Sequence, residues 1–124
     1  MADQTFRISG SVIHLKTRGP IAGLRVEAWD KDLIFDDFVG SAVTDAEGAF
    51  LIEFTQSHFR ELFLDRQPDL FFKVFDGEEL IKSTEDSVLW NVEAGDTAII
   101  IEVDLAAGDE TSSTLNQLKG RLTT

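Results

Sequence analysis

The segment from Leu24 to Phe50 constrains the fold of this 124-residue chain more than any other part of it. Residues 24–40 read LRVEAWDKDLIFDDFVG, and residues 44–50 read TDAEGAF. Alternation of apolar and polar residues with period two is typical of a strand that buries one face. Asp-Ala-Glu-Gly is typical of a tight turn in which Gly48 adopts a positive φ. The segment therefore predicts strand, acidic loop, strand, turn and strand.

Four other short segments complete the predicted architecture. The stretch from Leu70 to Phe75 is almost continuously apolar, which predicts burial on both faces. Gly10 interrupts the first alternating segment, so we expect a bulge or a close neighbour there. The predicted strands are residues 5–14, 24–29, 38–43, 50–54, 70–75, 79–83 and 99–105. Short strands separated by frequent turn signals predict an all-β fold, an antiparallel seven-stranded β-sandwich.

One part of the chain changes period. Phe59, Leu62 and Phe63 are spaced i, i+3 and i+4, which predicts one short amphipathic helix around residues 56–64. We expect residues 1–105 to form the sandwich domain. Residues 106–124 are mostly small and polar, and are predicted to be a flexible tail or an element that docks on a partner through its three leucines.

Composition excludes several classes of function. The formal net charge is −12 with no basic cluster, so nucleic acid is not an expected partner. No apolar stretch approaches the roughly 20 residues of a membrane span, and no Sec-type signal peptide is recognised, so the compartment stays open between the cytoplasm and export by another route. The chain has no cysteine, which excludes disulfides and thiolate ligands. The expected partner is another protein, or a second copy that pairs through a sheet edge or the tail.

The acidic loop is the candidate site. Ca²⁺ takes six to eight oxygen ligands, commonly carboxylates on one loop. The candidate ligands are Asp30, Asp32, Asp36 and Asp37. The loop resembles a calcium-binding loop of a C2 domain, which needs a second acidic loop, here from Asp76 or Asp86. In the alternative interpretation the aspartates cap turns by accepting backbone N–H groups, while Leu33 and Phe35 plug the end of the sandwich.

No catalytic arrangement is recognisable. His14 and His58 lie far apart in the sequence, and neither has a carboxylate or a second histidine at ligand spacing. The chain has no nucleophile elbow, P-loop or dinucleotide-binding glycine motif. We therefore expect no enzymatic activity, no catalytic residue and no cofactor other than a possible Ca²⁺.

Three motifs carry a family resemblance. They are Pro20-Ile-Ala-Gly-Leu-x-Val26, Trp29-Asp-x-Asp32 and Thr44-Asp-Ala-x-Gly48-x-Phe50. Over residues 6–105 the chain resembles the transthyretin-like, carboxypeptidase-regulatory-like β-sandwich superfamily, above all modules of bacterial Tc-toxin-type and neuraminidase-domain proteins.

The resemblance implies a non-catalytic interaction or structural module, accessory to a toxin or injection-type assembly. The hydrolase branch of the superfamily carries several His and Arg residues and a C-terminal Tyr-Arg-Gly-Ser. This chain has no tyrosine and ends in Arg121-Leu-Thr-Thr, so it lacks that signature. The alternative to the interaction module is a Ca²⁺-dependent, C2-like binding domain that uses residues 30–37.

Overall fold

The computed structural model describes residues 4–32, 34–55 and 67–105. The elements are β1 (Thr5–His14), β2 (Arg25–Asp30), β3 (Asp37–Val43), β4 (Ala49–Thr55), β5 (Leu70–Asp76), β6 (Glu79–Ser83), a 3₁₀ turn η1 (Glu85–Ser87) and β7 (Gly95–Val103). The predicted all-β sandwich is confirmed, and its last strand begins at Gly95 rather than at Ile99. The predicted helix, His58 and the predicted tail lie outside the described residues. No helix in the described ranges is long and apolar enough to cross a membrane.

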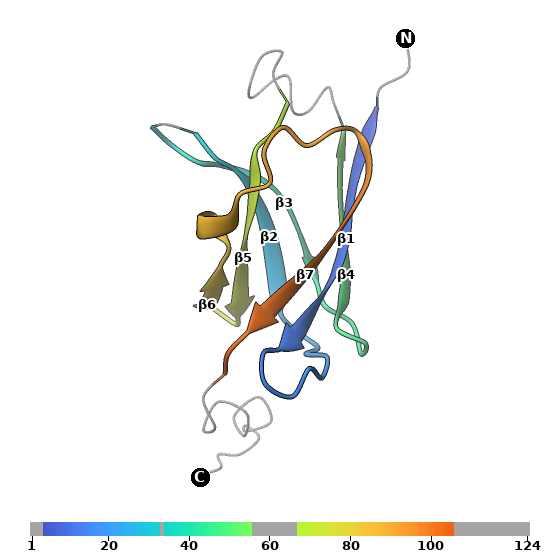
Figure 1. The fold of residues 1–124 in the computed structure, drawn as a ribbon, viewed down its shortest axis with the longest axis vertical. Helices are drawn as coiled ribbons and strands as arrows, with labels where there is room; N and C mark the ends of the chain where they lie inside the picture. The colour runs from blue at the N-terminus through green and yellow to red at the C-terminus, as the bar shows by residue number, and fades with distance from the viewer. Residues whose placement is uncertain (1–3, 33, 56–66, 106–124) are drawn as a thin grey trace.

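The strands form two sheets that face each other (Figure 1). One sheet has the order β4-β1-β7 and the other the order β3-β2-β5-β6. All the strand pairs are antiparallel except β1 with β7, which run parallel from Phe6 opposite Gly95 to His14 opposite Val103. The sequence predicted antiparallel strands throughout. Side-chain alternation is the same in both kinds of pairing, so it carries no information about strand direction.

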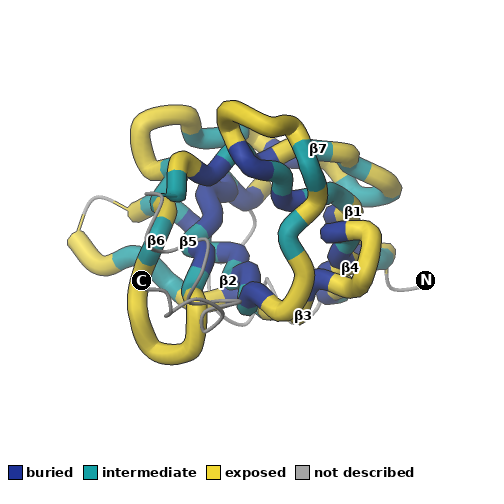
Figure 2. Tube along the Cα trace, turned by 90° about the horizontal axis from the view of Figure 1, so that it is seen from below, coloured by how far each residue is buried: buried dark blue, intermediate teal, exposed yellow. Residues whose placement is uncertain are grey.

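The core lies between the two sheets, where alternate residues of each strand are buried. In Figure 2, buried positions lie along the strands that border the centre, whereas the surrounding loops are largely exposed. The inward residues include Phe6, Ile8 and Val12 of β1, Val26 and Ala28 of β2, Ile52 and Phe54 of β4, Phe72 and Val74 of β5, and Ile101 and Val103 of β7. The rings of Phe6 and Phe54 stack with centroids 4.7 Å apart.

Burial on both faces of β5 is confirmed at Leu70, Phe71, Phe72 and Val74, whereas Lys73 and Phe75 are half-buried. Phe71, on the outer face, is fully buried, although it does not belong to the central cluster. Cationic side chains lie over the aromatic rings of this face. The Lys73 ammonium is 4.0 Å from the Trp29 ring centroid, and the Arg25 guanidinium carbon is 4.4 Å from that of Phe75. Such cation–π contacts cover apolar rings with charge, so these rings do not form an open apolar patch.

The turn between β3 and β4 has the predicted chemistry. One Asp45 carboxylate oxygen accepts the backbone N–H groups of Glu47 and Ala49, each at 2.9 Å. Gly48 has φ of 74°, and a Cβ there would lie 2.8 Å from the Val12 carbonyl oxygen. Glycine is required at this position both for the left-handed backbone and for the close approach of β1.

Gly10 allows three strands to meet closely. A Cβ at this position would lie 2.5 Å from the Ile99 carbonyl oxygen of β7 and 2.9 Å from the Phe50 ring of β4. The predicted close neighbour is thus confirmed on both sides of β1. The missing side chain lets the Phe50 ring pack against the middle of the three-stranded sheet.

We expect Gly10→Ala to lower the free energy of unfolding by about 1–3 kcal/mol, because the added methyl group overpacks backbone that cannot move independently. Urea denaturation followed by circular dichroism measures this change. Gly19→Ala is the matched control, since the nearest atom to its added Cβ is Thr17 Oγ1 at 3.4 Å. Equal stability of the two variants would contradict the assignment of Gly10 as a packing requirement.

Candidate metal centre

Three aspartates converge where β2 ends and β3 begins. Asp30 is the last residue of β2, Asp37 is the first of β3, and Asp32 lies in the loop between them. One carboxylate oxygen from each residue lies within 4.8 Å of the other two. Oxygen ligands around one hard cation at 2.3–2.6 Å lie within about 5 Å of one another, so these oxygens fit a common ion.

A β-bulge determines which residue of β3 lies opposite Asp30. The register of β2 against β3 shifts between Ala28 and Trp29, so that Ala28 lies opposite Gly40 and Trp29 lies opposite Phe38. Without this extra residue on β3, Asp30 would face Phe38; with it, Asp30 faces Asp37. Bulges commonly redirect side chains in this way beside functional sites. The bulge is therefore the local reason why two carboxylates, and not a carboxylate and a ring, meet at this end of the sheet.

Asp30 is the buried floor of the cluster. Its side chain is 0 % exposed, and one carboxylate oxygen accepts the backbone N–H of Asp69 at 2.8 Å. The Asp69 carboxylate in turn accepts the backbone N–H of Asn91 at 2.7 Å. The Asp69 carbonyl oxygen accepts the backbone N–H of Lys31, also at 2.7 Å. These bonds tie the end of β2 to the start of β5. The position of the Asp30 carboxylate is consequently fixed by the sheet and not by the loop.

Lys31 supplies positive charge next to the cluster. Its ammonium nitrogen is 2.6 Å from a Glu85 carboxylate oxygen and 3.9 Å from an Asp36 carboxylate oxygen. The hydrogen bond to Glu85, assisted by the charges of Asp36 and Glu85 and opposed by partial desolvation, raises the pKa of Lys31 above its ordinary value. Lys31 therefore stays protonated and compensates the carboxylates of Glu85 and Asp36.

The structure sorts the four predicted loop ligands. Asp30, Asp32 and Asp37 come together, whereas Asp36 ion-pairs with Lys31 and accepts the backbone N–H of Asp32 at 3.0 Å. Asp32 also accepts the Ile34 N–H at 3.3 Å. Turn capping and clustering thus occur in the same loop. The expected plug is wrong for Phe35, which is 77 % exposed, and Leu33 lies outside the described residues.

Neither expected residue of a second acidic loop joins the cluster. Asp76 lies at the other end of β5, because Phe75 pairs with Arg25 while Leu70 pairs with Asp30. Asp86 lies in η1, and the residue of η1 that contacts Lys31 is its neighbour Glu85. Sequence reasoning missed Asp69 and Glu85. The one available signal for Asp69 was its position directly after Pro68, at the start of a buried strand.

His14 has a structural role in the described part of the chain. It is 7 % exposed, and its Nδ1 accepts the backbone N–H of Lys16 at 3.1 Å, capping the turn after β1. It lies at the opposite end of the sandwich from the loop between β2 and β3 (Figure 1). His14 therefore cannot contribute a nitrogen ligand to the aspartate cluster.

The donor set decides which ions fit. Non-haem iron in oxygenases is commonly held by two histidines and one carboxylate, whereas carboxylate oxygens suit Mg²⁺, Ca²⁺ and Mn²⁺. The cluster offers carboxylates only, and the chain has no tyrosine or cysteine. A histidine-ligated iron centre does not fit these residues. A hard divalent cation fits this donor set.

Comparison with known proteins gives likeness of fold only. No family model matches the chain, and no curated protein matches its sequence. A 9R-lipoxygenase from Cyanothece PCC8801 is similar over 82 % of this chain and 16 % of its own length, with a TM-score of 0.61 and 20 % identity. The dioxygenase domain of a dioxygenase carbohydrate-binding protein fusion from Streptomyces sp. SirexAA-E is similar over 85 % of this chain and 82 % of its own, with a TM-score of 0.53 and 16 % identity.

A third similar structure is also named as a dioxygenase. Catechol 1,2-dioxygenase from Acinetobacter sp. ADP1 is similar over 87 % of this chain and 55 % of its own, with a TM-score of 0.50 and 11 % identity. This chain thus spans about a sixth of the lipoxygenase and about half of the catechol dioxygenase. What is shared is the β-sandwich.

These neighbours correct the family prediction. The resemblance to transthyretin-like, toxin-associated modules is wrong, since the similar structures are a lipoxygenase and dioxygenases. The motifs behind it encode local geometry. Thr44-Asp-Ala-x-Gly48-x-Phe50 is the capped turn between β3 and β4, and Trp29-Asp-x-Asp32 is the end of β2. Any β-sandwich with such turns can carry them, so they specify turns and not ancestry.

The similar structures also correct the functional prediction. The non-catalytic interaction module was implied by the transthyretin-like resemblance, and the absence of enzymatic activity was inferred from the lack of a recognisable catalytic motif. Both predictions are wrong in light of neighbours that are named as enzymes. The cofactor expectation was none other than Ca²⁺ at the acidic loop, and its metal part is supported, because three described carboxylates lie close enough together to hold a metal ion.

The buried hydrogen bond of Asp30 gives a test of the site's framework. We expect Asp30→Ala to lower the free energy of unfolding by about 1–3 kcal/mol, because it leaves the half-buried Asp69 N–H without this acceptor. Asp30→Asn keeps an oxygen acceptor of the same size and should retain most of the stability. Thermal and urea unfolding in EDTA measure both variants, and equal losses would show that this hydrogen bond does not hold β2 to β5.

Proposed function

We propose that this protein is a metal-dependent enzyme with a dioxygenase-like fold, and that Asp30, Asp32 and Asp37 hold the divalent cation on which its activity depends. The convergence of the three carboxylates at the bulged end of β2 and β3 carries this proposal. The likeness to chains named as dioxygenases supports the enzymatic part. Because one fold can serve many functions, the site has more weight here than the likeness.

The graded burial of the three carboxylates suits a reactive metal centre. Asp30 is buried, Asp37 is half-buried and Asp32 is exposed. A cation held by these three has its protein ligands on one side and keeps open positions toward solvent, which is the arrangement that lets a metal polarise a substrate oxygen. Asp30 is held by the Asp69 N–H, so the protein side of the site is fixed before any ion binds.

Charge also favours a cation at this site. The chain has a formal net charge of −12, and like charges brought this close repel one another when no ion is bound. The ion pairs of Lys31 in the described residues are with Glu85 and Asp36, neither of which belongs to the cluster. Carboxylate ligands suit Mg²⁺, Ca²⁺ and Mn²⁺ better than they suit metals that prefer nitrogen or sulfur. We assign Mn²⁺ as the ion that supports activity, since unlike Ca²⁺ it can also exchange single electrons.

Metal binding can be tested by thermal unfolding. We expect Mn²⁺ and Ca²⁺ to raise the midpoint of the EDTA-treated protein, because an ion that binds only the folded state adds about 2.7 kcal/mol at 100 times its Kd. Asp32→Asn should abolish this response. Asp45→Asn is the matched control, since Asp45 is also an exposed aspartate that caps a turn and lies outside the cluster. An unchanged midpoint in the unmodified protein would refute the metal site.

Activity needs a separate measurement. With Mn²⁺ bound, we expect the protein to consume dioxygen when catechol is the probe substrate. The unmodified protein and Asp45→Asn should do so at equal rates. Asp32→Asn should be no faster than Mn²⁺ without protein. An oxygen electrode records the rates, and the free-metal rate is subtracted. If the midpoint shifts with metal but no dioxygen is consumed, the metal site stands and the dioxygenase-type reaction with this substrate is wrong.

A further inference from the structure

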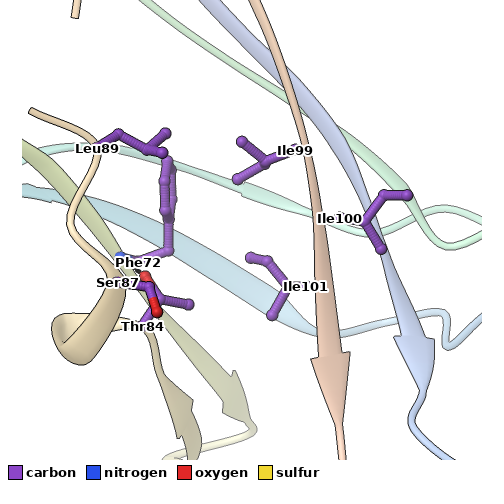
Figure 3. Close-up of a pocket in the computed structure, with 7 residues that line it drawn as sticks. All are labelled: Phe72, Thr84, Ser87, Leu89, Ile99, Ile100 and Ile101. Atoms are coloured by element: carbon purple, nitrogen blue, oxygen red, sulfur yellow. Dashed lines mark hydrogen bonds between the residues drawn. The ribbon is translucent and has the colours of Figure 1, made fainter.

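A second site lies between the two sheets, away from the aspartate cluster. It is a cavity of about 190 Å³ whose wall is mostly apolar. We call it the β5–β7 pocket, and its lining residues are Phe72, Thr84, Ser87, Leu89, Ile99, Ile100 and Ile101 (Figure 3). On the other side of the sandwich β3 and β4 contact each other, whereas this side is bordered by β6, η1 and β7.

The walls of the β5–β7 pocket come from both layers. Phe72 rises from β5, and the side chains of Ile99 and Ile101 point toward it from β7 (Figure 3). Ile100, between them, points to the outer face of its sheet and is 66 % exposed. Phe72 and Ile101 are almost fully buried, while Leu89 and Ile99 are half-buried. The pocket therefore has a buried floor and a more accessible rim.

Backbone hydrogen bonds hold these walls in place. Phe72 and Thr84 are joined twice, by the Thr84 N–H to the Phe72 carbonyl and by the Phe72 N–H to the Thr84 Oγ1, both at 2.8 Å. Leu89 exchanges two bonds of 2.8 Å with Leu70. Ile99 lies opposite Gly10 in the parallel pair of β1 and β7. A cavity formed by fixed backbone is present before a ligand arrives, as small-molecule sites usually are.

One end of the pocket is polar. Thr84 Oγ1 accepts the Phe72 N–H and still has its own hydroxyl hydrogen to donate. Ser87 lies beside it in η1 (Figure 3). An adjoining polar recess of about 420 Å³ shares Thr84 and Ser87 and also contains Lys82, Asp86 and Glu102. A ligand with an apolar body and one polar end would therefore place that end at Thr84 and Ser87.

Size and charge narrow the ligand class. An apolar cavity of about 150 Å³ accepts benzene, so the β5–β7 pocket has room for one ring and a small substituent. The Phe72 ring offers an aromatic partner. An anion would have to lose its hydration in an apolar slot, beside a recess that carries two carboxylates, Asp86 and Glu102, and one lysine, Lys82. These features favour a neutral ligand.

We propose that the β5–β7 pocket binds a neutral, single-ring aromatic molecule that carries one oxygen acceptor, with the ring between Phe72 and the isoleucines of β7 and the oxygen at the Thr84 hydroxyl. The site is built from the inner faces of β5 and β7 and includes none of the three clustered aspartates. It goes beyond the proposed metal-dependent activity and does not rest on it.

Titration of the metal-free protein in EDTA tests the proposal. The probes are benzyl alcohol, benzene and benzoate, and the readout is the set of isoleucine methyl signals in NMR spectra of methyl-labelled protein. We expect benzyl alcohol to shift the signals of Ile99 and Ile101 in a saturable way in the millimolar range. Benzene should bind several-fold more weakly, and benzoate should leave these signals unchanged. No saturable shift with benzyl alcohol would overturn the proposal.

Two variants separate filling of the pocket from general disturbance. Ile99→Phe places a ring in the pocket and should weaken benzyl alcohol binding at least tenfold, with the remaining signals dispersed as in a folded protein. Ala98→Phe adds a ring at an exposed position of the same strand that does not line the pocket, and should bind as the unmodified protein does. Equal binding by all three proteins would place the ligand elsewhere and refute the site.

The polar end has its own pair of variants. Thr84→Val removes the hydroxyl, and should abolish the preference for benzyl alcohol over benzene, whereas Thr84→Ser should keep it. A preference that survives Thr84→Val would refute the assigned orientation. Removal of residues 106–124 is the last comparison. If that deletion alone shifts the Ile99 and Ile101 signals, the chain's own C-terminal segment occupies the pocket and a small aromatic ligand is not its occupant.

Discussion

Burial of alternate side chains in one layer between two sheets is the interaction on which the rest of this structure depends. Each fully buried Ile, Leu or Phe contributes about 1.5–3 kcal/mol relative to an exposed position. Ile8, Ile52 and Phe72 are all of this kind. The sheets that this layer holds in place then position the polar features. Asp30 is aimed by the end of β2, and Thr84 is held by its bonds to β5. The candidate sites are consequences of the core and not independent of it.

Strand β5 connects the two candidate sites. Leu70, at its start, lies opposite Asp30 and exchanges hydrogen bonds with Leu89, while Phe72, two residues later, forms a wall of the β5–β7 pocket. The outer face of the same strand carries Phe71 and Lys73, whose contacts with Lys31 and Trp29 cover it. A displacement of β5 would therefore reach both sites at once. Because interiors are close-packed, such a strand transmits changes instead of absorbing them.

The features that could be predicted from the sequence are those that depend on residues close together in the chain, such as strands and turns. Period-two alternation located the strands, and the turn ending in Gly48 was correct because one residue's positive φ determines it. The parallel partner of β1, the bulge between Ala28 and Trp29, and the contacts of Asp69 and Glu85 depend on segments that meet only after folding. Aspartates that are adjacent in the sequence could be nominated as ligands, but only the bulge separates Asp37, which faces Asp30, from Asp36, which faces Lys31. The mistaken family arose in the same way, from motifs that describe turns.

The parallel pairing of β1 with β7 has a consequence for biosynthesis. The ribosome makes Thr5–His14 before the other strands, and Gly95–Val103 only after the whole second sheet has been translated. Until then β1 has β4 along one edge, and its other edge exposes unpaired N–H and C=O groups that can join strands of other nascent chains. Contacts so distant in sequence also form slowly. The interval between the emergence of β4 and that of β7 is therefore the period in which this protein is most exposed to aggregation, and the period in which a chaperone would do most for its yield.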